Sequence, residues 1–123
     1  RTAERLVTKS QQRVTVTLFW RATGTPSTNY TAFVHLIDAD GTYVAGFDQP
    51  PAEGRFPTSL WRPGDTSLSD FTINVPPDLA PGSYELWAGL YDGASPTLDR
   101  LPITASDLAT KDNRVLLDTV VIP

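Results

Sequence analysis

The chain has 123 residues and a formal net charge of −4, and it contains no cysteine. This length fits one domain with one hydrophobic core. The lack of cysteine excludes disulfide bonds and thiolate metal sites. Fourteen acidic against ten basic residues argue against nucleic acid as a partner, because nucleic-acid-binding faces are usually basic.

The segment carries no apolar run of membrane-spanning length, so we expect no direct membrane insertion by it. It starts at Arg1 and contains no methionine. We therefore expect residues 1–123 to be a single domain taken from a longer protein.

The first half of the chain alternates between strand patterns and turn residues. A short strand is expected at residues 6–8. Residues 13–20 alternate apolar and polar side chains, which predicts a half-buried strand with Trp20 facing inward. Residues 30–37 are apolar on both faces and predict a central strand. Asp38-Ala39-Asp40-Gly41 then predicts a hairpin turn, with Gly41 in a left-handed conformation and residues 42–47 as the partner strand.

The second half begins with a proline-rich connection. Residues 50–63 predict a crossover rather than a central strand, because proline cannot donate to a sheet ladder. The side chain of Trp61, in this crossover, is expected to fill one open edge of the sandwich. Further strands are expected at residues 65–75, 83–91 and 115–122. The polar stretch 93–113 is longer than a hairpin needs, and such loops are often functional or disordered.

A proline-glycine turn leads into the strand at 83–91. Leu79-x-x-Gly82-x-Tyr84 matches the corner at which many β-sandwiches pass from one sheet to the other. We expect the Tyr84 hydroxyl to be buried and bonded to backbone within residues 76–82. Together, about seven short strands predict an all-β fold, a two-sheet antiparallel immunoglobulin-like β-sandwich.

Several segments, taken in order, resemble those of an immunoglobulin-like accessory domain. Such domains are found at the extracytoplasmic end of large bacterial membrane proteins. Many of these proteins are similar to glycosyltransferases of the dolichyl-phosphate-mannose type. The segments are Tyr30-Thr31-Ala32-Phe33-Val34-His35-Leu36-Ile37-Asp38 with Asp40-Gly41, Asp48-Gln49-Pro50-Pro51, Pro57-Thr58-Ser59-Leu60-Trp61-Arg62-Pro63-Gly64-Asp65, Leu79-Ala80-Pro81-Gly82-Ser83-Tyr84 and Gly89-Leu90-Tyr91-Asp92. The resemblance implies a non-catalytic accessory or interaction module outside the cytoplasm, with the neighbouring domains of its parent protein as partners. It carries no catalytic residues and no cofactor. Such domains usually have a polar residue at position 87, so Trp87 marks a face that is either specialised or covered.

Two features have the residue types of a reactive or metal-binding site. Asp38 and Asp40 begin a calcium-loop pattern, but the twelfth position from Asp38 is Gln49 rather than glutamate. A hairpin turn explains the segment better, and we predict no metal site. His35 is the only histidine, and a catalytic triad would require it. Its place in the middle of a strand favours a structural hydrogen bond to a loop carbonyl.

An enzyme is the least favoured class. Glycoside hydrolysis needs two carboxyl groups held across a cleft. Most acids of this chain lie in predicted turns, where aspartate binds its own backbone. We therefore predict no catalytic residues.

Trp87 and Tyr91 are the candidate ligand or interface residues. They lie four residues apart on the strand face opposite Leu86 and Leu90, with Gly89 between them and Glu85 on the same face. Two rings beside a bare glycine make a shelf on which a sugar could stack, with Glu85 holding hydroxyl groups. The favoured alternative is that the 93–113 loop or a neighbouring domain covers the rings. The sequence thus predicts an interaction module, with a carbohydrate-binding module as the alternative.

Overall fold

The computed structural model describes residues 3–6, 13–105 and 108–122, which form one β-sandwich. Within these ranges the elements are β1 (Ala3–Leu6), β2 (Arg13–Arg21), β3 (Thr31–Ile37), β4 (Tyr43–Gln49), the 3₁₀ helices η1 (Pro51–Gly54) and η2 (Thr58–Leu60), β5 (Thr66–Asn74), β6 (Gly82–Tyr91), β7 (Thr110–Lys111) and β8 (Arg114–Ile122). The strand positions agree with the sequence pattern to within a few residues. For the strand expected at 6–8, residues 7 and 8 lie outside the described ranges.

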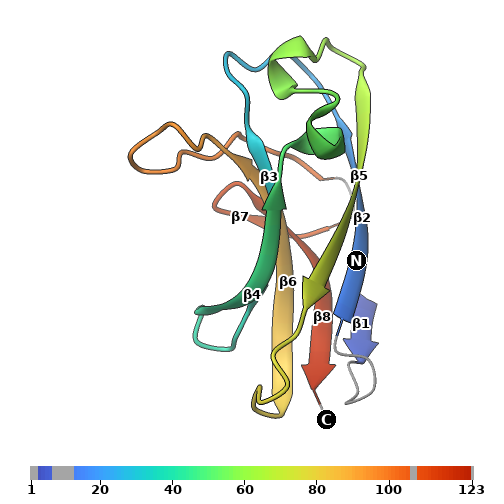
Figure 1. Cartoon of the computed structure of the whole chain (residues 1–123), viewed down its shortest axis with the longest axis vertical. Helices are drawn as coiled ribbons and strands as arrows, with labels where there is room; N and C mark the ends of the chain where they lie inside the picture. The colour runs from blue at the N-terminus through green and yellow to red at the C-terminus, as the bar shows by residue number, and fades with distance from the viewer. Residues whose placement is uncertain (1–2, 7–12, 106–107, 123) are drawn as a thin grey trace.

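Two sheets face each other across the core (Figure 1). The larger sheet has the order β1-β8-β6-β3-β4, and the short β7 pairs with β8. The smaller sheet consists of β2 and β5. The predicted all-β sandwich is confirmed. One pairing departs from the antiparallel pattern, because β1 runs parallel to β8.

The smaller sheet follows the alternation of its sequence. Along β5 every second residue is buried, and β2 shows the same period of two over most of its length. Val16 pairs with Phe71 in the antiparallel register, and both side chains belong to the core. Trp20 packs against the same core but remains partly exposed. This burial of one face gives the smaller sheet its fixed register.

The central strands of the larger sheet are β3 and β6. β3 lies between β4 and β6, as its two apolar faces predicted. At the entry to β6, the buried Tyr84 donates its hydroxyl hydrogen to the carbonyl oxygen of Ala80 over 2.6 Å. This contact confirms the predicted corner.

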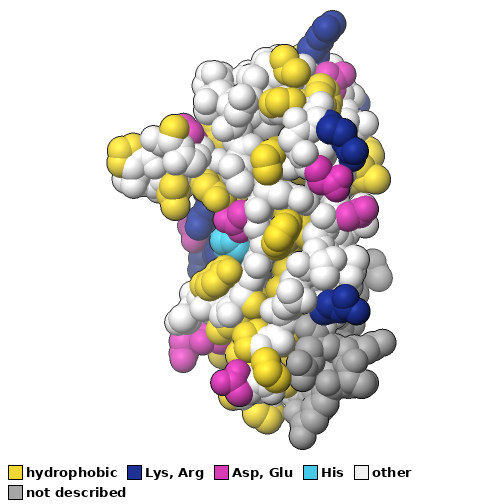
Figure 2. All heavy atoms as spheres, in the orientation of Figure 1, with side chains coloured by type: hydrophobic (Ala, Val, Ile, Leu, Met, Phe, Trp, Pro, Cys, Tyr) yellow, Lys and Arg dark blue, Asp and Glu magenta, His cyan; other side chains and the backbone are white. Residues whose placement is uncertain are grey.

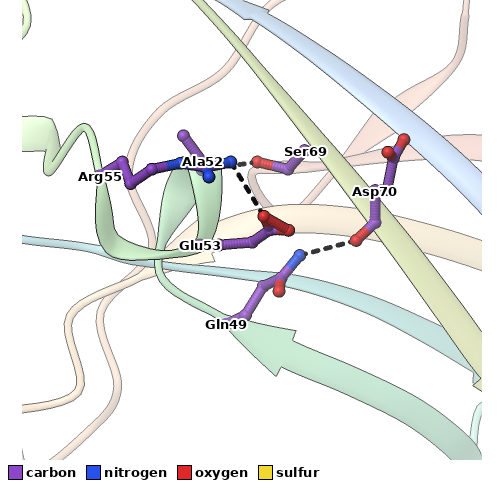
Figure 3. A network of polar contacts seen from close by, with 6 residues as sticks. All are labelled: Gln49, Ala52, Glu53, Arg55, Ser69 and Asp70. Atoms are coloured by element: carbon purple, nitrogen blue, oxygen red, sulfur yellow. Dashed lines mark hydrogen bonds and ion pairs between the residues drawn. The ribbon is translucent and has the colours of Figure 1, made fainter.

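The crossover from β4 to β5 joins the two sheets along one edge. The Gln49 side-chain amide donates to the carbonyl oxygen of Asp70 over 2.8 Å, and the amide of Ala52 donates to Ser69 Oγ over 2.8 Å (Figure 3). Both acceptors belong to β5. Side-chain and loop contacts therefore take the place of a neighbouring strand here. Farther along the crossover, Trp61 was expected to fill an open edge of the sandwich; it is buried and belongs to the core cluster.

Candidate functional site

The larger sheet carries a groove of about 600 Å³ on the face that points away from β2 and β5. Its lining residues come from β3, β4, β6 and the segment that follows β6: Phe33, His35, Asp48, Tyr91, Thr97, Leu98, Asp99, Arg100, Asp112 and Asn113. Figure 2 shows the histidine in a hollow below a projecting loop, with acidic and basic side chains gathered beside it. The size is that of a small-molecule site.

The floor of the groove is held together by Asp48. His35 Nε2 lies 2.7 Å from Asp48 Oδ1, and the Tyr91 hydroxyl donates to Asp48 Oδ2 over 2.8 Å. The expected hydrogen bond from His35 to a loop carbonyl is therefore wrong. The reason is the sheet register, which places His35 opposite Gly46 and leaves its imidazole free to lean toward the carboxylate of β4.

The surroundings of Tyr91 change the pKa of its hydroxyl group. Burial, together with the hydrogen bond to Asp48 and the charge of that carboxylate, raises the pKa of Tyr91 to about 12. A higher pKa keeps the phenol protonated, so Tyr91 acts as a hydrogen-bond donor within the floor. Its ring remains partly exposed to the groove.

The walls of the groove come from two segments of the stretch predicted as a long polar loop. One wall is the segment 97–100, which is tied to the end of β6 by the hydrogen bond from the Asp92 amide to the Asp99 carbonyl. The other is the turn between β7 and β8, where Asp112 and Asn113 both have positive φ, as in a type I′ hairpin. Arg100 Nη1 donates to the carbonyl oxygen of Asp112 over 3.0 Å and so connects the two walls.

Trp87 does not form the alternative sugar-stacking shelf with Tyr91. Its side chain is only 7% exposed, and the Arg114 guanidinium lies 4.5 Å from its ring centroid. Glu85, which is exposed, accepts a hydrogen bond of 3.2 Å from Trp87 Nε1. The covered alternative is thus correct for Trp87, although the cover is a residue of β8 rather than the 93–113 loop.

The space between the two rings is also filled. A Cβ atom at Gly89 would lie 2.7 Å from the Phe33 ring, because β3 places Phe33 directly opposite this glycine. Gly89 therefore makes room for Phe33 and does not provide an open notch for a sugar. Tyr91 alone of the three candidate residues lines the groove.

The acidic turn at Asp38 is a hairpin turn, as expected. Asp38 Oδ1 accepts hydrogen bonds of 2.9 Å from the amides of Asp40 and Thr42, and Gly41 has a φ of 84°. The aspartate thus binds its own backbone. Among the described residues, no cluster of three His, Cys, Asp or Glu side chains has a geometry that could hold a metal ion.

Sequence reasoning missed Phe33, Asp48 and Arg100 as parts of one site. The spacing of Phe33 and His35, which share a strand face, was an available signal. The contribution of Asp48 depends on the pairing of β4 with β3, and that of Arg100 depends on the path of the loop after β6. Neither can be read from local periodicity.

No protein family, curated protein or solved structure matches this chain. The resemblance to accessory domains of membrane glycosyltransferase-like proteins therefore stays a prediction. In the part of the chain that the structure describes, no helix has the length and apolar character to cross a membrane.

Proposed function

We propose that this domain is a non-catalytic accessory module, working outside the cytoplasm in a larger protein, that binds a carbohydrate in the groove on its outer sheet face. The observation that supports this most directly is the groove itself. It combines a volume of about 600 Å³ with an aromatic floor and polar walls. Most of its lining side chains are polar or charged, which suits a ligand rich in hydroxyl groups.

The groove has both kinds of group that a sugar needs. Tyr91 presents a partly exposed ring, against which the apolar face of a pyranose can pack. Asp99, Arg100 and Asn113 on the walls offer acceptors and donors for hydroxyl groups. As in the sequence-based hypothesis, Tyr91 provides the ring on which the sugar stacks. The groups on the walls of the groove take the place of Trp87 as the second part of the proposed site.

The contacts of Asp48 favour binding over catalysis. Both of its carboxylate oxygens already accept hydrogen bonds, from His35 and Tyr91. A general acid in glycoside hydrolysis must instead protonate the leaving oxygen. Asp48 is thus placed to hold the floor in shape.

A second candidate function is docking of a neighbouring domain on the smaller sheet. Phe19 and Leu68 are directly opposite each other in the β2–β5 register and are 64% and 59% exposed. Adjacent exposed apolar side chains often mark an association surface. If this pair docks a neighbour, the double variant F19S/L68S should separate the domains of the parent protein in limited proteolysis. An unchanged cleavage pattern would argue against docking here.

Carbohydrate binding is tested by a glycan array followed by calorimetric titration of the oligosaccharides that bind. Tyr91→Ala should weaken binding at least about tenfold, since stacking and hydrogen bonding of the ring are lost together. Phe19→Ala is the matched control, because it removes an exposed aromatic ring from the other sheet. A blank array, or equal binding by the Tyr91 variant with its fold intact, would refute the proposal.

A further inference from the structure

We propose that the carbohydrate bound in the groove carries an N-acetyl group, and that Leu98 packs against the methyl of that group. This inference rests on the proposed function and names the class of sugar that the same groove takes. The observation that carries it is an exposed leucine held in a left-handed backbone conformation at the wall of the groove.

Leu98 is unfavourable for the stability of the fold in two respects. Its φ is 50°, in the left-handed region that a bulky side chain rarely adopts. Its side chain is 53% exposed, so burial within the domain offsets little of this strain. Strained backbone is found preferentially at ligand sites, where the surrounding structure enforces it. A leucine that is both strained and exposed, and that lines a groove, is therefore expected to contact the ligand.

Hydrogen bonds within the segment hold Leu98 in this position. The Leu98 amide donates to the carbonyl oxygen of Ser95 over 3.1 Å, and the Asp99 amide donates to Ser95 Oγ over 3.4 Å. Thr97 Oγ1 donates to Asp99 Oδ1 over 2.6 Å. Figure 2 shows hydrophobic side chains on the projecting loop, next to the hollow that holds the histidine. The turn thus fixes an apolar side chain beside the Asp99 carboxylate.

The two residues after Leu98 match the polar part of an N-acetyl group, which has an amide N–H donor and a carbonyl acceptor. Among the described residues, Asp99 Oδ2 has no hydrogen-bond partner, so it can accept the amide hydrogen. Arg100 also lines the groove, and the N–H groups that it does not use on the Asp112 carbonyl can donate to the acetyl oxygen. Three consecutive lining residues therefore offer an apolar contact, an acceptor and a donor.

The charge of the lining agrees with a neutral ligand that offers hydrogen-bond donors. Three aspartates and one arginine line the groove. Asp48 uses both carboxylate oxygens within the floor, which leaves the acids of the walls to accept hydrogens from hydroxyl and amide groups. The amine of a deacetylated sugar would also satisfy these acids, but it has no methyl for Leu98. The test therefore includes such a sugar.

The test is calorimetric titration with oligosaccharides that share one backbone and differ in the group on the second carbon: cellotetraose with a hydroxyl, chitosan tetraose with an amine, and fully acetylated chitotetraose. The acetylated sugar should bind at least about fivefold more tightly than cellotetraose, because it adds a buried methyl and an amide hydrogen bond. Leu98→Asn keeps a residue that tolerates positive φ but removes the apolar contact, so the difference should narrow to less than about twofold. Leu98→Met retains an apolar side chain and should keep most of the difference.

Leu60→Asn is the matched control, since Leu60 is an exposed leucine of η2 that does not line the groove. The thermal midpoint of Leu98→Asn should stay close to that of the wild type, because relief of strain offsets the small loss of burial. A clear fall would overturn the inference, by showing that the leucine is needed for packing.

Equal binding of cellotetraose and the acetylated sugar would overturn the inference while leaving carbohydrate binding intact. So would a Leu98→Asn variant that keeps the full difference. Tightest binding of chitosan tetraose would overturn it as well, by showing that the acids alone select the ligand. If no saccharide binds, the proposed function itself fails and the inference fails with it.

Discussion

The smaller sheet and the outer face of the larger sheet show two different relations between sequence and burial. In β2 and β5 the alternating pattern decides burial almost alone, and the outward side chains remain exposed. In β6 the residues from Leu86 to Leu90 are buried on both faces of the sheet. The cover on the outer face comes from Phe33 and Arg114, which are far away in sequence. Local periodicity thus predicts the core face of a strand but not what covers the other face.

The largest effect is expected in the smaller sheet. Phe71→Ala removes a fully buried ring and should lower the free energy of unfolding by about 3–5 kcal/mol. Phe19→Ala, an identical change on the exposed face of the partner strand, should alter it by less than about 0.5 kcal/mol. Urea titration monitored by circular dichroism measures both. Similar losses in the two variants would break the comparison, because the sheet would then be covered on both sides.

Substitution of Trp87, on the outer face of the larger sheet, should lower the stability of the domain as substitution of a core residue does. Trp87→Ala should destabilise the domain by about 3 kcal/mol, at the lower end of the range for buried rings, because water can enter the space from the surface. The Trp87→Phe variant retains a ring beneath Arg114 and should lose less. Sugar binding should persist in the folded fraction of Trp87→Ala. A stable variant that no longer binds sugar would restore the shelf hypothesis.

Gly89 offers a smaller and more local probe of the same face. Gly89→Ala would place a methyl group against the Phe33 ring and 3.1 Å from the carbonyl oxygen of Asn113, so overpacking should cost about 1–3 kcal/mol. Gly24→Ala is the control, since a Cβ there meets no atom within 4 Å. Thermal unfolding compares the two. An unchanged midpoint for Gly89→Ala would mean that Phe33 does not seal the outer face.

The smallest effect concerns the ionisation of Tyr91. The pKa of Tyr91 rises from 10.0 to about 12 on folding, so the neutral phenol stabilises the folded state. This contribution is fully present below pH 10 and is lost as the pH rises from 10 toward 12. Stability of the wild type should therefore fall more steeply across this interval than that of Tyr91→Phe. Equal slopes in alkaline unfolding curves would show that burial and the contact with Asp48 do not raise the pKa of Tyr91 on folding.

How far the sequence predicts this molecule depends on how local each contact is. The Tyr84 corner could be predicted because donor and acceptor lie four residues apart. The hairpin turn at Asp38 is equally local. The floor of the groove joins Asp48 to Tyr91 across 43 positions, and only the shared neighbour β3 brings them together. Sites of the second kind require the strand order, which alternation does not contain.

The crossover contacts at β5 have a further consequence for the behaviour of the protein at high concentration. A sheet of two strands has two edges, and an open edge can template strands from other molecules into fibrils. The Gln49 side chain donates a hydrogen bond to the backbone carbonyl oxygen of Asp70 in β5, and η1 lies against the same strand (Figure 3). The prolines at 50 and 51 cannot donate hydrogen bonds to extend the ladder. The segment that links the two sheets thus also covers the middle of the β5 edge, where it should disfavour pairing with a strand of another molecule.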